Sequence, residues 1–248
     1  MLKKIAFLLL IFFCHSAYGQ KIETDRPDQT ESSSTVPAKH LQIESGILLG
    51  LSKNASNKEQ QILLPTNLFR LGLTKGIELR ILSQLESFQN NLGRSSGISD
   101  LEIGTKIHLF GRENSKTEVA FITHLVLPTG SSGLTNSKYG SISKLSISNV
   151  LTDYLELGYN IGYNYFGSGN GDLTYSLALG YDLNEKVGVY IEPYGEISEL
   201  NFWFSNVDAG FTYLIKDNLQ FDFSFGTGIN HRMNYLSLGM SWISISRK

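Results

Sequence analysis

Apolar and polar residues alternate along most of the chain after residue 39. In the clearest run, one face carries Leu219, Phe221, Phe223, Phe225, Thr227 and Ile229, and the other carries Gln220, Asp222, Ser224, Gly226, Gly228 and Asn230. A period of two indicates a β-strand whose two faces lie in different environments. No segment in this region shows the period of an amphipathic helix, so the sequence predicts an all-β protein.

The alternation recurs in about twelve segments. They cover residues 39–51, 61–74, 76–88, 99–110, 116–128, 141–150, 154–166, 172–183, 186–198, 203–215, 219–230 and 234–246. Each is long, at or above the roughly 9–11 residues that cross a bilayer as a tilted strand, where ordinary strands have about 5–6. Residues 61–73 alternate poorly, so the sequence does not assign which of their side chains face the lumen. Pro65 lies in this segment and marks a place for a kinked strand or a lateral gap in the barrel wall.

The connections between these segments alternate in length. Tight connections are predicted at residues 74–76, 111–115, 151–153, 184–185 and 216–218, and longer polar loops at 52–60, 87–98, 129–140 and 167–171. Outer-membrane barrels have short periplasmic turns, longer extracellular loops and an even number of antiparallel strands. The sequence therefore predicts a transmembrane, antiparallel, up-and-down β-barrel of about 12 strands, with both termini in the periplasm.

The chemistry of the two faces indicates which one meets lipid. The apolar face carries Phe, Leu, Ile and Tyr, and the other carries Gly, Ser, Thr, Asn and charged residues. Aromatic residues fall near the ends of segments, as an interfacial belt requires; they are Tyr165, Tyr181, Trp203, Tyr213 and Trp242. A soluble β-sandwich would also alternate, but strands of this length would need two large sheets, so the barrel is favoured.

The first 19 residues carry the pattern of a secretory signal peptide. Lys3 and Lys4 precede an apolar run at residues 5–13, and Ala17-Tyr18-Gly19 offers small residues for cleavage. A lipoprotein anchor on Cys14 is disfavoured because the bulky Phe13 precedes it. We therefore expect export into the envelope of a Gram-negative bacterium and location in the outer membrane.

The amino-acid composition argues against several other classes of protein. The 248 residues contain 41% hydrophobic and 11% aromatic residues, which argues against a disordered chain. Removal of residues 1–19 leaves 19 basic and 23 acidic residues and no cysteine. This near-neutral net charge gives no indication of a basic surface that would bind nucleic acid. The absence of several apolar runs of about 20 residues excludes a helical membrane protein.

Several motifs resemble a known bacterial family. They are Thr24-Asp25-Arg26-Pro27-Asp28-Gln29-Thr30-Glu31-Ser32, Val36-Pro37, Leu41-Gln42-Ile43-Glu44-Ser45-Gly46, Leu127-Pro128-Thr129-Gly130, Asp208-Ala209-Gly210-Phe211-Thr212-Tyr213 and Gly239-Met240-Ser241-Trp242. This set resembles the family described as "putative MetA-pathway of phenol degradation". The resemblance implies an outer-membrane β-barrel with a transport role, without naming a substrate, and suggests aromatic or hydrophobic cargo.

The polar segment at residues 20–38 precedes the first strand and holds the most specific of these motifs. Its candidate functional residues are Asp25, Arg26, Pro27, Asp28 and Glu31. Two interpretations stay open: a solvated periplasmic tail, or a plug folded into the barrel, with Arg26 pairing lumen carboxylates. The expected organisation is thus a signal peptide at 1–19, this segment at 20–38 and the barrel at 39–248.

The lumen face supplies the other candidates. The residues expected to line the pore are Glu78, Arg80, Glu102, Lys106, His108, Glu118, His124, Glu156, Glu192, Glu196 and Asp222. Acidic residues outnumber basic ones, which favours a cation-preferring pore. The same residues are also consistent with a water-filled wall held by ion pairs, or with a lumen filled by its own side chains.

An enzyme is the alternative to a channel or transporter. A lipid hydrolase needs a serine and a histidine within hydrogen-bond distance, exposed to the lipid side, but His108 and His124 are expected to face the lumen. No zinc-binding HExxH motif occurs. We therefore expect no catalytic residue, no metal site and no cofactor.

The sequence predicts a channel or transporter for small molecules. The alternative is a structural or lipid-modifying outer-membrane barrel without pore activity. Expected partners are outer-membrane lipid, an unidentified small-molecule solute and, during biogenesis, the barrel-assembly machinery.

Overall fold

The computed structural model describes residues 22–53, 57–111 and 115–244. All regular structure in these residues is β-strand. The strands are β1 (Leu41–Lys53), β2 (Lys58–Thr74), β3 (Ile77–Asn90), β4 (Gly93–Ile98), β5 (Leu101–Phe110), β6 (Thr117–Leu127), β7 (Gly140–Thr152), β8 (Leu155–Tyr165), β9 (Asp172–Asn184), β10 (Val187–Ser198), β11 (Phe202–Lys216), β12 (Leu219–Gly228) and β13 (Arg232–Ile243). The described residues include no helix long and apolar enough to cross a membrane.

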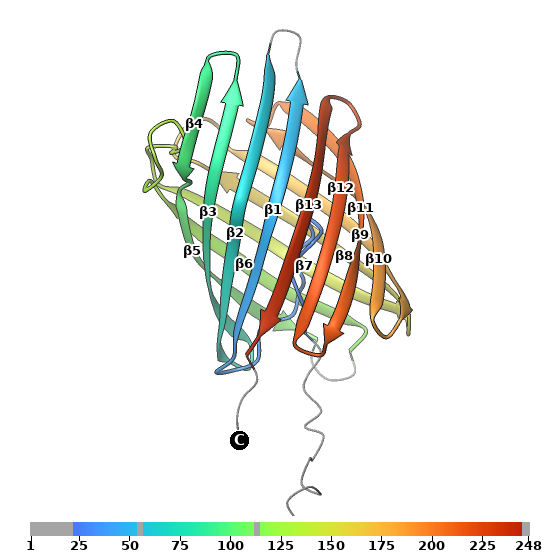
Figure 1. Cartoon of the computed structure of the whole chain (residues 1–248). Coiled ribbons are helices and arrows are strands. Elements are labelled where there is room, and N and C mark those ends of the chain that lie inside the picture. The colour runs from blue at the N-terminus through green and yellow to red at the C-terminus, as the bar shows by residue number, and fades with distance from the viewer. Residues whose placement is uncertain (1–21, 54–56, 112–114, 245–248) are drawn as a thin grey trace, which may run out of the picture.

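The strands form one closed antiparallel barrel (Figure 1). The first strand pairs with the last, because β1 lies between β2 and β13. The short strand β4 pairs with residues 85–90 of β3, and β5 pairs with residues 77–82 of the same strand. Since β4 and β5 occupy one position in succession, the barrel has twelve strand positions. The predicted fold is confirmed.

The burial pattern is the reverse of a soluble protein. Along β12, Gln220, Asp222 and Ser224 are buried, whereas Phe221 and Phe225 are exposed, Phe225 by 52%. The largest fully buried side chains are mostly polar: Arg70, Arg80, Lys106, Gln42, Glu44, Glu78 and Glu192, together with Ile122. Large exposed apolar side chains cover the outside instead, and a bilayer is the environment that such a surface requires.

Two local features differ from the expectations. The predicted loop over residues 87–98 is wrong, because β3 continues to Asn90 and β4 begins at Gly93. These residues carry polar side chains on both faces of the hairpin, so the apolar alternation that identifies a strand is missing there.

The irregularity at Pro65 is a bulge. Pairing with β3 passes from Leu63 to Thr66, and pairing with β1 resumes on both sides of the same point. A bulge bends a strand and leaves the ladder intact around it. Within the described residues, β2 is thus paired along both edges, which removes the basis for a lateral gap there.

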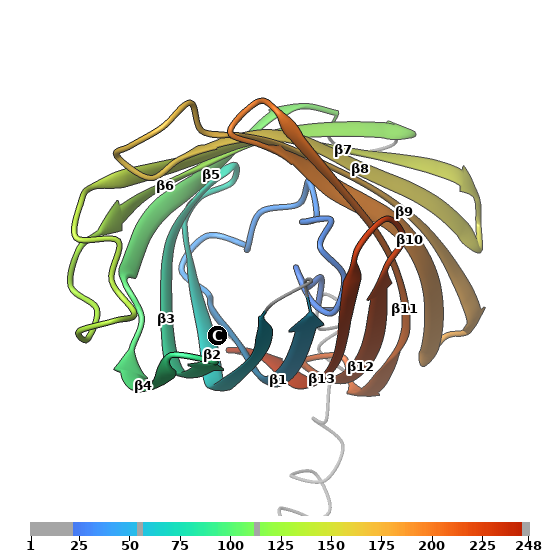
Figure 2. The same ribbon diagram turned by 90° about the horizontal axis from the view of Figure 1, so that it is seen from above.

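Residues 22–40, here called the N-terminal segment, lie inside the barrel (Figure 2). The segment enters at the end with the tight turns, where Ile22 N–H donates to the carbonyl of Asp217 at 2.8 Å. It reaches β1 at the same end, where Lys39 N–H donates to the carbonyl of Gly72 at 2.7 Å. Between these points the segment runs through the lumen. The expected signal peptide lies outside the described residues.

Candidate functional site: the lumen and the N-terminal segment

One side of the lumen carries three buried cations, here called the basic cluster: Arg70, Arg80 and Lys106. They come from neighbouring strands, because Arg70 on β2 lies opposite Arg80 on β3, and Glu78 on β3 lies opposite Lys106 on β5. Each side chain is at most 2% exposed. Like charges directly opposite one another destabilise a sheet, so this cluster requires nearby carboxylates.

Asp25 of the N-terminal segment supplies the central carboxylate. Its oxygens lie 2.6 Å from Arg80 Nη1, 2.8 Å from Lys106 Nζ and 3.4 Å from Arg70 Nη1. Burial alone would raise the pKa of this carboxyl, but Arg70, Lys106 and Arg80 outweigh it and hold the pKa of Asp25 well below its usual range. Asp25 is therefore an ionised partner shared by three cations.

Two wall carboxylates complete this network. Glu44 accepts from Arg70 at 2.8 Å, and Glu78 accepts from Arg70 at 2.8 Å and from Arg80 at 2.9 Å. Arg70 is not among the predicted lumen residues, because the bulge at Pro65 shifts the alternation of β2. Alternation counted only from Asn67 onward would have placed Arg70 on the lumen face.

Glu31 extends the ion pairs to the next strands. Its carboxylate accepts from Arg80 and, at 2.8 Å, from Lys144 Nζ. The Lys144 and Arg80 charges offset the effect of burial and hold the pKa of Glu31 well below its usual range. The backbone of Glu31 is bound as well, since Asn160 accepts from its N–H at 2.8 Å and donates to its carbonyl at 3.1 Å.

Arg26 lies in a slot between the first and last strands. Gly46 on β1 and Gly239 on β13 are paired in register, and a Cβ atom at Gly46 would lie 2.6 Å from the Arg26 guanidinium. A Cβ at Gly239 would meet the same group. Arg26 Nη2 donates to Asp222 at 3.0 Å and to Ser237 at 2.9 Å. The missing side chains of the glycine pair thus let the guanidinium lie against the wall.

The opposite side of the lumen is acidic. Glu192, Asp208 and Asp222, here called the acidic wall, are all buried, and Glu192 lies directly opposite Asp208. Gln29 N–H donates to Glu192 at 2.7 Å, and the Thr30 hydroxyl donates to the same carboxylate. Asp208 accepts from Tyr235 through one oxygen, and its other oxygen has no partner among the described residues.

Asp28 faces the acidic wall without a cation. Burial, and then the charge of Glu192, raise the pKa of Asp28 well above its ordinary value. Asp208 and Asp25 act in the same direction. Asp28 is therefore held toward its neutral form, in contrast to Asp25 only three residues earlier.

The two lumen histidines differ in their surroundings. His124 is bound through both ring nitrogens, to Glu102 at 2.7 Å and to Arg80 Nε at 3.0 Å. His108 Nε2 is buried and has no hydrogen-bond partner among the described residues. Neither histidine is hydrogen-bonded to a serine, so the described residues show no serine–histidine pair of the kind a hydrolase needs.

The remaining candidates lie further from the ion pairs. Glu118 accepts weak hydrogen bonds from Ser33 at 3.4 Å and from Ser34 at 3.3 Å. Glu156 lines the lumen near the tight turns, and Glu196 lines it near the longer loops. Pro27 is buried between Arg26 and Asp28. No group of three or more His, Cys, Asp or Glu side chains in the described ranges has the geometry to hold a metal ion.

Among the cavities of the described residues, two lie in the lumen on opposite sides of the N-terminal segment. The cavity toward the tight turns, of about 440 Å³, is lined by Thr30, Glu118 and Glu156 among others. The cavity toward the longer loops, of about 470 Å³, is lined by Gln29, Lys144 and Glu196 with Asn160, Tyr175, Tyr194 and Asn206. The two cavities share no described lining residue. The segment around Gln29 and Thr30 therefore separates them.

Comparisons with known proteins agree with this architecture. A family model described as "Putative MetA-pathway of phenol degradation" matches residues 24–241. An outer membrane channel from Pseudomonas putida F1 is similar with a TM-score of 0.72 at 12% identity, over 90% of this chain and 100% of that chain. The KdgM porin, in complex with disordered oligogalacturonate, is similar with a TM-score of 0.57 at 12% identity, over 83% and 99%. No curated protein matches the chain. At these identities the structural likeness shows the fold, which is that of outer-membrane β-barrels.

Proposed function

The chain belongs to the family described as "Putative MetA-pathway of phenol degradation", and from this premise we propose that it is an outer-membrane channel for small molecules whose N-terminal segment closes the lumen. The observation that carries the proposal is the separation of two lumen cavities by one segment. That segment is bound to both sides of the wall, through Asp25 on one side and Arg26 on the other. A barrel with only a structural role needs neither an aqueous cavity nor a separating segment.

The cargo that we propose is a small molecule, with aromatic or hydrophobic compounds as the first class to test. The family description points to this class. The cavity toward the longer loops adds support, because Tyr175, Tyr194 and Phe204 line it together with polar side chains. Such a mixture suits a small aromatic ring that carries hydroxyl groups.

A reversible lock tests the closing role of the segment. The hydroxyl oxygens of Thr30 and Ser176 lie 2.6 Å apart, so the double variant Thr30→Cys/Ser176→Cys is expected to form a disulfide between segment and wall. The sequence has one cysteine, Cys14, within the expected signal peptide, and the variant is prepared without residues 1–19, so that no other cysteine competes. In a planar bilayer we expect low conductance in the oxidised form and higher conductance after a reductant is added.

The matched control is Ser87→Cys/Ser96→Cys, since these hydroxyls lie 3.0 Å apart on the β3–β4 hairpin, away from the lumen. Its conductance should not respond to reductant. Equal conductance of the locked and reduced Thr30/Ser176 variant would contradict closure by the segment. A protein without residues 20–38 that still fails to conduct would favour the structural alternative.

We also propose that the open pathway prefers cations. With the segment in place, Arg70, Arg80, Lys106 and Lys144 are all paired with carboxylates. Glu156 and Glu196 line the two cavities and have no ion-pair partner among the described residues. Unpaired acidic groups along a pore favour cations. Reversal potentials in a salt gradient measure this preference, and a clear preference for anions would exclude it.

A further inference from the structure

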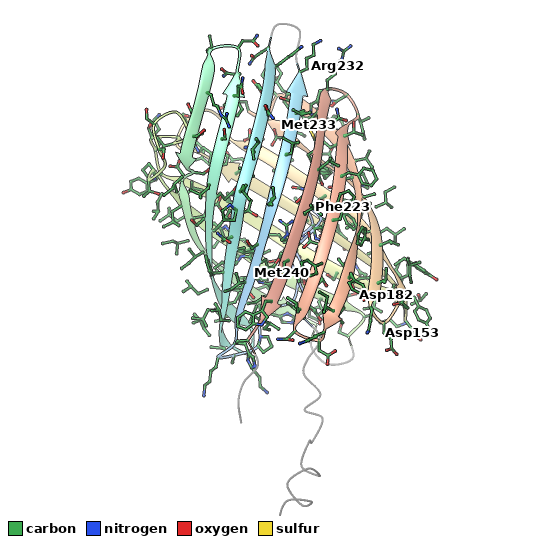
Figure 3. The ribbon with its side chains drawn as sticks, viewed as in Figure 1. Asp153, Asp182, Phe223, Arg232, Met233 and Met240 are labelled. Atoms are coloured by element: carbon green, nitrogen blue, oxygen red, sulfur yellow. The ribbon has the colours of Figure 1, made fainter. Side chains whose placement is uncertain are left out.

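Three cations lie side by side at the end of the barrel that carries the longer loops. Arg232 on β13 is directly opposite Lys53 on β1, and Lys53 is directly opposite Lys58 on β2. We call these three residues the cation row. Figure 3 shows Arg232 at the upper end of β13, with Met240 further down the same strand. The register places the three Cβ atoms in adjacent positions, about 5 Å apart.

The cation row is on the outer surface, at the edge of the apolar band. On β1 the outward positions before Lys53 are Leu49 and Leu51, and Leu51 is 49% exposed. Leu49 lies opposite Leu236 and Ile62 in the same register. The row therefore follows directly after the surface that meets acyl chains, at the level of lipid headgroups.

No carboxylate forms an ion pair with the row among the described residues; Glu59, which lines the same hollow, accepts instead from Ser52 and Asn57. None of the three side chains forms an ion pair or a hydrogen bond among the described residues. The connection between Lys53 and Lys58 adds no charge, because residues 54–56 are Asn, Ala and Ser. Like charges directly opposite one another cost stability, and this cost is offset when an anion binds between them. The barrel places its own acids on the lumen face instead.

The three cations also line one surface hollow. A hollow of about 730 Å³ is bordered by Lys53, Lys58 and Arg232, with Gln60 and Asn234 among its polar neighbours. Lysine and arginine with adjacent amides are the donors that bind phosphate oxygens. The hollow is thus a site with three cations against one carboxylate, Glu59, with hydrogen-bond donors and an apolar surface directly below it.

We propose that the cation row binds phosphate groups of a phosphorylated glycolipid in the outer leaflet of the membrane. The phosphates lie between the three cations, and the acyl chains lie along Leu49 and Leu51. The three cations face away from the lumen, whereas Ser52 and His231 of the hollow also line the cavity toward the longer loops. Free phosphate carries the same headgroup chemistry, so the experiment separates the two sources.

The test uses the purified mature protein in detergent and three probes: bisphosphorylated lipid A, lipid A without phosphates, and inorganic phosphate at the same phosphate concentration. Binding is measured by native mass spectrometry. The variant is Lys53→Gln/Lys58→Gln/Arg232→Gln, and the matched control is Lys75→Gln/Lys186→Gln/Lys216→Gln, which removes three charges at the opposite end. Each cation is expected to contribute about tenfold or less to the dissociation constant, so the first variant should bind bisphosphorylated lipid A about 100-fold more weakly than the wild type. The control should bind it like the wild type.

Thermal unfolding gives an independent readout. Without lipid, the cation-row variant should melt at or slightly above the temperature of the wild type, because repulsion within the row is gone. With bisphosphorylated lipid A, only the wild type and the control should gain stability. Equal binding of lipid A by both triple variants, equal binding without phosphates, or equal stabilisation by inorganic phosphate alone would each overturn the proposal.

Discussion

On the side of β2, β3 and β5, the N-terminal segment binds through buried ion pairs, whereas on the side of β10 and β11 it binds through neutral donors. Asp25 meets all three cations of the basic cluster. Glu192, in contrast, receives a backbone N–H and a threonine hydroxyl. The difference teaches that three buried cations of the wall share one carboxylate of the segment on the first side, whereas on the side of β10 and β11 a buried carboxylate of the wall accepts from neutral groups of the segment.

The largest test of this comparison removes the anchor. Asp25→Asn leaves Arg70, Arg80 and Lys106 without their shared anion, and breaking a buried ion pair typically costs about 3–5 kcal/mol. We expect the segment to leave the wall, so that protease cleaves it faster and conductance in a planar bilayer rises. Glu196→Gln is the control for protease cleavage, because Glu196 lines the lumen but forms no hydrogen bond or ion pair with the segment among the described residues. A variant with unchanged conductance and cleavage would show that the basic cluster does not hold the segment.

A medium effect is expected at the slot of Arg26. Gly239→Ala places a Cβ against the guanidinium, and overpacking of this kind costs about 1–3 kcal/mol. Arg26 should then lose its contact with Asp222, and the conductance of the closed state should rise less than in Asp25→Asn. The control on the neighbouring strand is Gly50→Ala, where the nearest atom to the new Cβ is 3.6 Å away. Should both alanine variants behave alike, the slot has no role in holding Arg26.

The smallest effect concerns pH. The pKa of Asp28 is raised above its ordinary value of 3.8, so its neutral form stabilises the bound segment. This contribution is complete below pH 3.8 and is lost as the pH rises through the raised pKa. The groups that face Asp28 are Glu192, Asp208 and Tyr190, with Asp25 nearby.

Conductance of the wild type should therefore increase as the pH rises above about 4, and Asp28→Asn should flatten that dependence. The measurement is single-channel conductance across a pH series at constant ionic strength. A wild-type conductance that falls with rising pH has the wrong sign and would exclude Asp28 as the titrating group.

The barrel could be predicted from the sequence because its signal is local. Along β12, apolar residues such as Phe221 and Phe223 face the lipid, and polar residues such as Asp222 face the lumen. The same rule fails where both faces meet water, which is why β4 was predicted as a loop. It fails again after the bulge at Pro65, which is why Arg70 was missed.

The position of the N-terminal segment could not be derived in this way. Arg26 and Asp222 are 196 residues apart, and Glu31 and Lys144 are 113 residues apart. Their pairing depends on the closed barrel, which brings distant strands to one lumen. The residue types at Asp25, Arg26 and Glu31 indicated that ion pairs were available, but not which partners they have. The sequence alone therefore did not distinguish the tail from the plug.

The slot of Arg26 also has a consequence for the order of assembly. Gly46 belongs to the first strand and Gly239 to the last, and Asp222 belongs to the strand before it. This binding place does not exist in a nascent sheet, because its two halves come together only when β13 pairs with β1. Contacts between the two ends of a chain form late in folding. Arg26 is therefore expected to enter its slot only after barrel closure, whereas the contacts of Asp25 with β2, β3 and β5 do not depend on that closure.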